Sequence, residues 1–298
     1  MLRETLHGTG VALVTPFSAD LEIDYHALTR LIDFVVRGGV EYIVTLGTTG
    51  ETPTLSREEK MDLIRFTYDQ VNGKVPVVVG IGGNNTEELV KDLEKFPLEK
   101  ATAVLSASPY YSKPSQEGLF AHYKVLAEAS PKPILLYNVP SRTGRNISAA
   151  TTIRLAKEVD NIAGIKEASG DMVQCMQIIR DRPEDFLVVS GDDALAFPQI
   201  ACGMDGVISV AANSFPGNFA EMVRAALKGE LVTARMINDQ LLEGYDLLFA
   251  ENNPAGVKAA LAELGIIQNF LRLPLVPLSE NLNQKLRSYL AKNFSLEV

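Results

Sequence analysis

One lysine in this chain stands where few lysines are found, at the end of an apolar run. Residues 161–165 read Asn-Ile-Ala-Gly-Ile, and Lys166 follows them directly. Such an aliphatic run is typical of a buried strand, so an amine at its end must either pair with an anion or give up its charge. An uncharged amine is the nucleophile that forms Schiff bases with carbonyl compounds. The position of Lys166 therefore predicts imine chemistry, although a lysine that simply turns into solvent is the commoner case.

Other polar side chains follow other apolar runs and complement this amine. The segment 47–50, Gly-Thr-Thr-Gly, offers backbone amides and the hydroxyls of Thr48 and Thr49 to a small carboxylate. Tyr137 can transfer protons, and Arg142 can hold a second carboxylate through two parallel hydrogen bonds. Together with the lysine, these residues suit a small 2-oxo acid. A sugar phosphate fits less well, because no lysine or arginine flanks the loops after the last two runs, where barrels usually bind phosphate.

Each of these residues also has a purely structural interpretation. Tyr137 can be an ordinary strand aromatic, Arg142 a solvated loop charge, and the two threonines simple turn residues. The neighbouring acids Asp192 and Asp193 suggest a divalent cation, but no histidine or third carboxylate stands convincingly at a neighbouring run. We therefore expect neither a metal ion nor another cofactor.

The elements that must position these side chains are eight short aliphatic runs separated by amphipathic stretches. The runs are residues 11–16, 42–46, 75–81, 103–107, 133–138, 162–166, 186–190 and 206–210. Helix-start signals lie between them, such as Ser56 followed three residues later by Glu59. Eight evenly spaced runs, with no Gly-rich turn after the first, favour a closed (β/α)8 barrel of the TIM type over an open α/β sheet.

The alternation stops near residue 229. Residues 1–228 are predicted to form the catalytic barrel, and 229–298 a C-terminal helical region. Its three predicted helices span residues 232–249, 255–264 and 278–292.

The overall composition narrows the class of partner. The formal net charge of −9 over 298 residues argues against nucleic acid or an anionic membrane as the main partner. Two cysteines cannot build a disulfide framework, and the first residues lack the apolar core of a signal peptide. We expect a cytoplasmic protein.

Three motifs resemble those of the dihydrodipicolinate synthase family, a group within the class I pyruvate aldolases and lyases. They are Gly-Thr-Thr-Gly-Glu at 47–51, Tyr-Asn-Val-Pro-Ser-Arg-Thr-Gly at 137–144 and Gly-Ile-Lys-Glu-Ala-Ser-Gly-Asp at 164–171. The resemblance extends over essentially the whole chain. It implies a Schiff-base condensation of pyruvate with L-aspartate 4-semialdehyde, giving 4-hydroxy-tetrahydrodipicolinate in diaminopimelate and lysine biosynthesis.

The resemblance also assigns roles to residues. It implies that Lys166 forms the imine and that Tyr137, Thr48 and Tyr111 relay protons, with Tyr111 contributed across a dimer interface. It further implies that Thr49 and the backbone at Gly191 and Ile208 line the pyruvate pocket, and that Arg142 receives the carboxylate of the aldehyde. The expected assembly is a dimer of dimers.

Many members of this family are inhibited by lysine at a site on the dimer interface. Asn84, Glu88 and Tyr110 match positions that bind lysine there, and Thr52 and Pro53 lie in the adjoining loop. Arg57 and Lys60 stand where sensitive members often carry histidine, and added positive charge should weaken the binding of a lysine ammonium. We expect feedback to be weak.

Two alternatives stay open at this point. The first is a related pyruvate aldolase acting on a sialic or sugar acid, which would need neutral hydroxyl partners rather than Arg142. The second is a catalytically silent barrel that senses a small molecule, which predicts the loss of Lys166, Tyr137 or Arg142.

Overall fold

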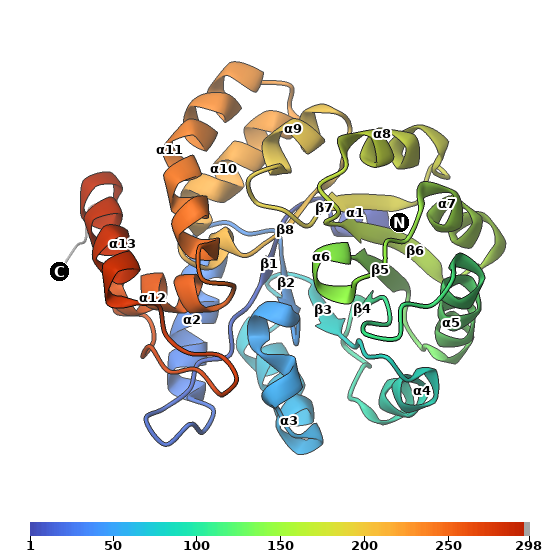
Figure 1. Cartoon of the computed structure of the whole chain (residues 1–298), viewed down its shortest axis with the longest axis horizontal. Coiled ribbons are helices and arrows are strands. Elements are labelled where there is room, and N and C mark those ends of the chain that lie inside the picture. The colour runs from blue at the N-terminus through green and yellow to red at the C-terminus, as the bar shows by residue number, and fades with distance from the viewer. Residues whose placement is uncertain (295–298) are drawn as a thin grey trace.

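The computed structural model describes residues 1–294 and contains a closed barrel of eight parallel strands, in which the last strand pairs with the first (Figure 1). The strands are β1 (Gly8–Ala12), β2 (Tyr42–Thr45), β3 (Val77–Gly80), β4 (Ala103–Ala107), β5 (Ile134–Asn138), β6 (Ile162–Glu167), β7 (Leu187–Ser190) and β8 (Gly206–Ser209). The prediction of a (β/α)8 barrel with C-terminal helices is confirmed.

The first strand begins earlier than its apolar run indicated, at Gly8 rather than Val11. Residues 8–10 are Gly-Thr-Gly and carry no hydrophobic pattern that could mark them as a strand. They are needed because the ring of Tyr42 fills the barrel beside Gly10, where any side chain would collide with it. The missing side chain at Gly10 is thus what allows this strand to close the barrel.

Helices surround the barrel and bury the outward faces of the strands. They are α2 (Tyr25–Arg37), α3 (Arg57–Val71), α4 (Thr86–Lys95), α5 (Gln116–Ala129), α7 (Ala149–Glu158), α8 (Met172–Asp181), α9 (Ala196–Ala201) and α10 (Pro216–Leu227). The short helices α1 (Leu2–Thr5) and α6 (Pro140–Thr143) and the 3-10 turns η1 (Thr48–Gly50), η2 (Thr52–Thr54) and η3 (Ala211–Asn213) lie at the strand ends. Ser56 and Glu59 form the predicted capping box at the start of α3.

Strand residues alternate between two hydrophobic cores. Ile165 and Val188 face outward and pack under the helices, whereas Tyr42, Val44 and Leu105 fill the interior of the barrel. Lys166 follows Ile165 and therefore belongs to the inward set.

The C-terminal region consists of α11 (Leu231–Phe249), α12 (Ala255–Glu263) and α13 (Glu280–Asn293). Figure 1 shows these helices together on one side of the barrel, where α11 packs along α10. The division at residue 229 stays a prediction, and residues 295–298 of that region lie outside the described residues. No helix within residues 1–294 is long and apolar enough to cross a membrane.

A charged cluster closes the end of the barrel at which the strands begin. Asp205 is buried and accepts a hydrogen bond from Arg3 Nε at 2.9 Å and another from the Val188 amide at 2.9 Å. It also forms an ion pair with the guanidinium of Arg182. In TIM barrels this end contributes stability, because the catalytic loops gather at the opposite end.

Candidate functional site

Lys166 lies on β6 with its side chain inside the mouth of the barrel. Only 5% of the residue is exposed. Across residues 1–294 it takes part in no ion pair, whereas the other buried lysine, Lys258, is paired with Glu51. An amine that lies at the mouth of the barrel and is not held in an ion pair can add to the carbonyl carbon of a bound ligand.

Tyr137 places an aromatic ring and a hydroxyl group next to this amine. It lies opposite Lys166 in the register between β5 and β6, and Lys166 Nζ lies 4.3 Å from the centroid of its ring. The prediction that the two residues belong to one site therefore agrees with their geometry. The ring face can stabilise positive charge on the nitrogen, while the hydroxyl can exchange protons nearby.

A cavity of about 500 Å³ surrounds these two side chains. The predicted residues on its wall are Thr48, Thr49, Tyr137, Arg142, Lys166 and Gly191. Its walls are partly apolar, through Val44, Leu105 and Val139. Such a cavity suits a small ligand held by a few convergent polar groups.

The two threonines lie in η1, directly after β2. Thr49 is buried, and its Oγ1 accepts a hydrogen bond from Asn253 Nδ2 at 2.9 Å. The Gly50 carbonyl accepts one from Thr15 Oγ1 at 2.7 Å. These two hydrogen bonds fix the loop, so its hydroxyls and amides can bind a carboxylate in the cavity without reorganising.

Gly191 and Arg142 reach the cavity from two other strand ends. A side chain at Gly191 would lie 2.9 Å from Lys166 Cε, so glycine leaves the lysine room at this point. Arg142 lies on α6, is exposed, and donates a hydrogen bond from Nη2 to Asn252 Oδ1 at 3.3 Å. Ile208 is buried within the barrel and does not line the cavity, which is lined instead by Val210 of the same segment.

Glu167 follows the lysine on β6 and points away from the cavity. It is fully buried and accepts hydrogen bonds from the Asn138 side chain, the Ser169 amide and the Gln174 side chain, all between 2.7 and 3.1 Å. This network joins the ends of β5 and β6 to α8. The network fixes the backbone that carries Lys166. Glu167 belongs to the Gly-Ile-Lys-Glu-Ala-Ser-Gly-Asp motif, but the motif does not indicate this structural role.

Asp193 is a second buried acid at the strand ends, and its contacts are structural. It accepts hydrogen bonds from the Val210 amide at 3.1 Å and the Ala211 amide at 2.8 Å. Burial raises the pKa of its carboxyl to about 6. Within residues 1–294, no group of three or more potential metal-binding side chains comes together. The acid thus fixes the turn after β8 at the cavity wall.

Tyr111 lies outside this cavity. It has a left-handed backbone conformation with φ of 69° and is 89% exposed, so its ring extends away from the chain that carries it. Within one chain it does not join the other predicted catalytic residues.

A second cavity of about 510 Å³ adjoins the first. Of the residues predicted for a lysine effector, Thr52, Pro53 and Tyr110 line it, whereas Asn84 and Glu88 do not. Lys60 lies on its wall, and partial burial lowers the pKa of that amine.

The C-terminal region also contributes to the first cavity, through Asn253, Tyr245 and Phe249. No strand-end pattern marks these residues in the sequence, because they follow the barrel in the chain. They were missed for that reason.

A closed parallel barrel with a buried amine and convergent hydroxyls at the carboxyl ends of its strands defines the class as a (β/α)8-barrel enzyme. A model of the Dihydrodipicolinate synthetase family matches residues 5–293. The chain belongs to this family.

Relatives and solved structures agree with this assignment. The 4-hydroxy-tetrahydrodipicolinate synthase of Flavobacterium psychrophilum is 49% identical over 279 residues, covering 94% of this chain and 95% of that protein. A crystal structure of dihydrodipicolinate synthase from Thermotoga maritima has a TM-score of 0.94 and 41% identity, covering 97% of this chain and 99% of that one. The corresponding enzyme from Acinetobacter baumannii, solved in complex with pyruvate, has a TM-score of 0.94 and 39% identity over 97% of this chain and 99% of that one. These matches confirm the predicted family and the predicted lyase activity, 4-hydroxy-tetrahydrodipicolinate synthase.

Proposed function

We propose that the chain condenses pyruvate with L-aspartate 4-semialdehyde through an imine between Lys166 and pyruvate. The amine adds to the ketone carbon and water leaves, which gives the imine. Loss of a methyl proton then gives the enamine that attacks the aldehyde carbon of L-aspartate 4-semialdehyde. The observation that carries the proposal is the buried Lys166 amine, which opens onto a small cavity and has no ion-pair partner among residues 1–294. The pyruvate complex of the A. baumannii relative supports the same first substrate.

The surrounding residues then take distinct roles. Tyr137 and Thr48 relay protons, since both line the cavity that holds the amine. Thr49 and the backbone at Gly191 hold the carboxylate of pyruvate, and Ile208 supports that wall from within the barrel. Arg142 holds the carboxylate of the aldehyde substrate at the open side.

Tyr111 completes the relay in a neighbouring copy of the chain. At 89% exposure, its own chain leaves this large aromatic residue almost uncovered, as expected for a residue donated across an interface. We propose that the chains assemble as a dimer of dimers.

The experiment that tests the proposed function is reductive trapping. The protein is incubated with pyruvate and borohydride, and the added mass is located by peptide mapping. We expect the label on Lys166, no label in Lys166→Met, and normal labelling in the surface control Lys157→Met. A label on another residue, or none in the unaltered protein, would refute the imine. Turnover is then measured separately with aspartate semialdehyde plus pyruvate and with N-acetylneuraminate. The substrate that is consumed distinguishes the synthase from a sialic-acid aldolase.

Lysine feedback is proposed to be weak. Lys60 brings positive charge to the second cavity, and Glu88 is already paired with Lys91 at 2.9 Å. An incoming ammonium therefore meets a like charge and finds Glu88 engaged elsewhere. We expect activity to stay near its full value at millimolar lysine, whereas Lys60→His should increase the sensitivity to lysine. Strong inhibition of the unaltered protein at micromolar lysine would contradict this.

A cytoplasmic location belongs to the same proposal. Its support is that Cys175 and Cys202 are both free, which suits a reducing compartment.

A further inference from the structure

A buried ion pair joins the C-terminal region to the loop that carries Thr48 and Thr49. Glu51 directly follows that loop, and its carboxylate is paired with the amine of Lys258 on α12. Both side chains have no exposed surface. Lys258 Nζ also donates a hydrogen bond to the Phe270 carbonyl at 2.9 Å and lies 4.2 Å from the centroid of the Phe17 ring.

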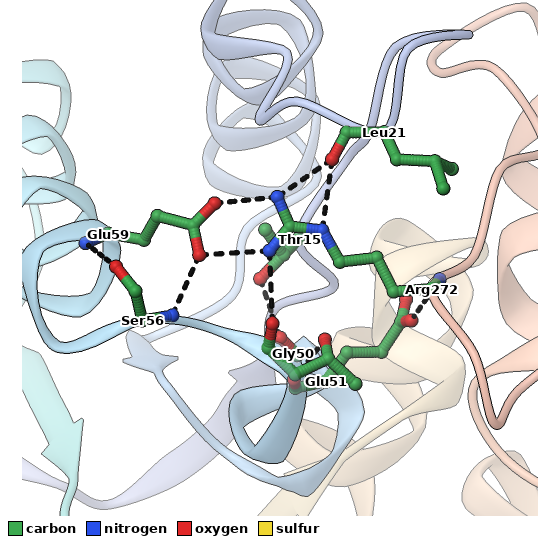
Figure 2. Close-up of polar contacts among 8 residues, drawn as sticks. Thr15, Leu21, Gly50, Glu51, Ser56, Glu59 and Arg272 are labelled. Atoms are coloured by element: carbon green, nitrogen blue, oxygen red, sulfur yellow. Dashed lines mark hydrogen bonds and ion pairs between the residues drawn. The ribbon is translucent and has the colours of Figure 1, made fainter.

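Arg272 extends this connection from the segment after α12. Its amide donates a hydrogen bond to Glu51 Oε2 at 3.0 Å, and its guanidinium donates to both oxygens of Glu59, at 2.6 and 2.9 Å. The same group donates to the carbonyls of Leu21 and Thr54. Figure 2 shows the arginine between Glu59 and the Leu21 carbonyl, with Glu51 beneath it.

The segment fixed in this way is strained. Glu51 has a left-handed backbone with φ of 54°, a conformation that is unfavourable for a residue other than glycine. Such a conformation persists only where surrounding contacts determine it. Here the Glu51 carboxylate accepts a hydrogen bond from the Arg272 amide. On the preceding residue, the Gly50 carbonyl accepts one from Thr15 Oγ1 at 2.7 Å. The turn that places Thr48 and Thr49 is therefore maintained by residues more than 200 positions later.

We propose that Glu51, Lys258 and Arg272 are positioning residues of the synthase, which set the place of the Thr48 and Thr49 hydroxyls at the cavity. This inference rests on the proposed function, since it assigns the threonines to pyruvate and to proton transfer. A cluster that served stability alone would have no reason to act on pyruvate binding. A displacement of about 1 Å in such hydroxyls can cost about 100-fold in rate.

The test replaces the ion pair without leaving a lone charge. In the double variant Glu51→Gln with Lys258→Met, both groups become neutral at similar volume, which avoids the cost of a buried unpaired charge. We expect the KM for pyruvate to rise about 10-fold and kcat to fall, measured where circular dichroism shows the variant folded. Borohydride should still label Lys166 at saturating pyruvate.

A matched control is Asp205→Asn at the opposite end of the barrel, where an acid is also buried among arginines. It should lower the melting temperature and leave the KM for pyruvate unchanged. An unaltered KM and kcat in the folded double variant would overturn the proposal, and so would an equal rise in KM in Asp205→Asn.

A second variant covers the case in which the double variant does not fold. Arg272→Lys keeps the positive charge beside Glu59 but loses the planar group that reaches Leu21 and Thr54 at once. We expect a smaller rise in KM for pyruvate, about 3-fold, with Arg272→Met larger. Equal, unchanged KM values in both would refute positioning by this cluster. If the unaltered protein is not labelled at Lys166, the proposed function fails instead, and that result is read independently of these variants.

Discussion

Tyr137 faces the Lys166 amine with its ring, so in the proposed reaction the ring and the hydroxyl have different roles. The ring centroid lies 4.3 Å from Nζ, within the range in which an aromatic face stabilises a cation. An iminium is such a cation. The hydroxyl, by contrast, can act only through proton transfer or hydrogen bonding.

Two substitutions separate these contributions. Tyr137→Phe should lower kcat by about 100-fold or more while borohydride still labels Lys166, because the cation-binding ring stays in place. Tyr137→Leu should also reduce the extent of labelling. Steady-state turnover and the stoichiometry of trapped pyruvate check both expectations. Equal turnover in Tyr137→Phe and the unaltered protein would show that the hydroxyl has no part in proton transfer.

At this scale the sequence was most informative about residues at strand ends. Lys166 and Tyr137 could be placed together because parallel strands bring their carboxyl ends to one mouth. Asn253 could not be placed, since its contact with Thr49 spans 204 positions and no periodic pattern reports it. The structural role of Glu167 was equally hidden, because an acid surrounded by neutral donors looks in sequence like any other acid.

Helices α4 and α5 are joined by a buried histidine whose protonation the fold opposes. His122 on α5 forms a hydrogen bond between its Nδ1 and Thr86 Oγ1 at 2.8 Å. Burial lowers the pKa of this imidazole from 6.5 to about 4. Between these two pH values the unfolded chain binds a proton at this position and the folded chain does not. Stability from this residue is therefore complete above pH 6.5 and is lost as the pH falls toward 4.

A substitution at this helix contact measures the effect. The full difference between the two pKa values corresponds to roughly 3 kcal/mol in the free energy of unfolding. His122→Gln retains a partner for Thr86 but cannot bind the proton. Its free energy of unfolding, from urea titrations at pH 7 and pH 4.5, should fall less with acid than that of the unaltered protein. A parallel fall in both would assign the acid sensitivity to other groups.

Among the elements, the strands followed from hydrophobic runs with errors of only a few residues. The exception, β1, depends on two glycines: a side chain at Gly10 would collide with the Tyr42 ring, and one at Gly8 would meet the Glu41 side chain. A pattern of apolar residues cannot reveal a strand position at which glycine is needed because there is no room for a side chain. The capping pair Ser56 and Glu59 was visible in the sequence, but its additional contact with Arg272 was not.

At the scale of the whole molecule, the exposed Tyr111 connects the proposed proton relay with the proposed assembly. Its ring is 89% exposed and lies outside the cavity of its own chain. If a neighbouring chain receives it, a single chain lacks one member of the proton relay. Activity per chain should then fall when the protein is diluted below the concentration at which it assembles.

Sedimentation and turnover measured over the same dilution series check this expectation. Tyr111→Phe should lower turnover about 10-fold or more while imine labelling and the sedimentation coefficient stay unchanged. Turnover that stays constant while the assembly dissociates would show that each chain is complete by itself.

The pairing of β1 with β8 affects how the chain can fold while it is being synthesised. Gly8 pairs with Gly206 and Val11 with Ser209, so the first strand gains its second neighbour only after nearly the whole barrel has left the ribosome. Until then a nascent chain presents an open strand edge, which invites association with other chains. Because Lys258 and Arg272 emerge later still, their contacts with Glu51 can form only after all eight barrel strands have been synthesised.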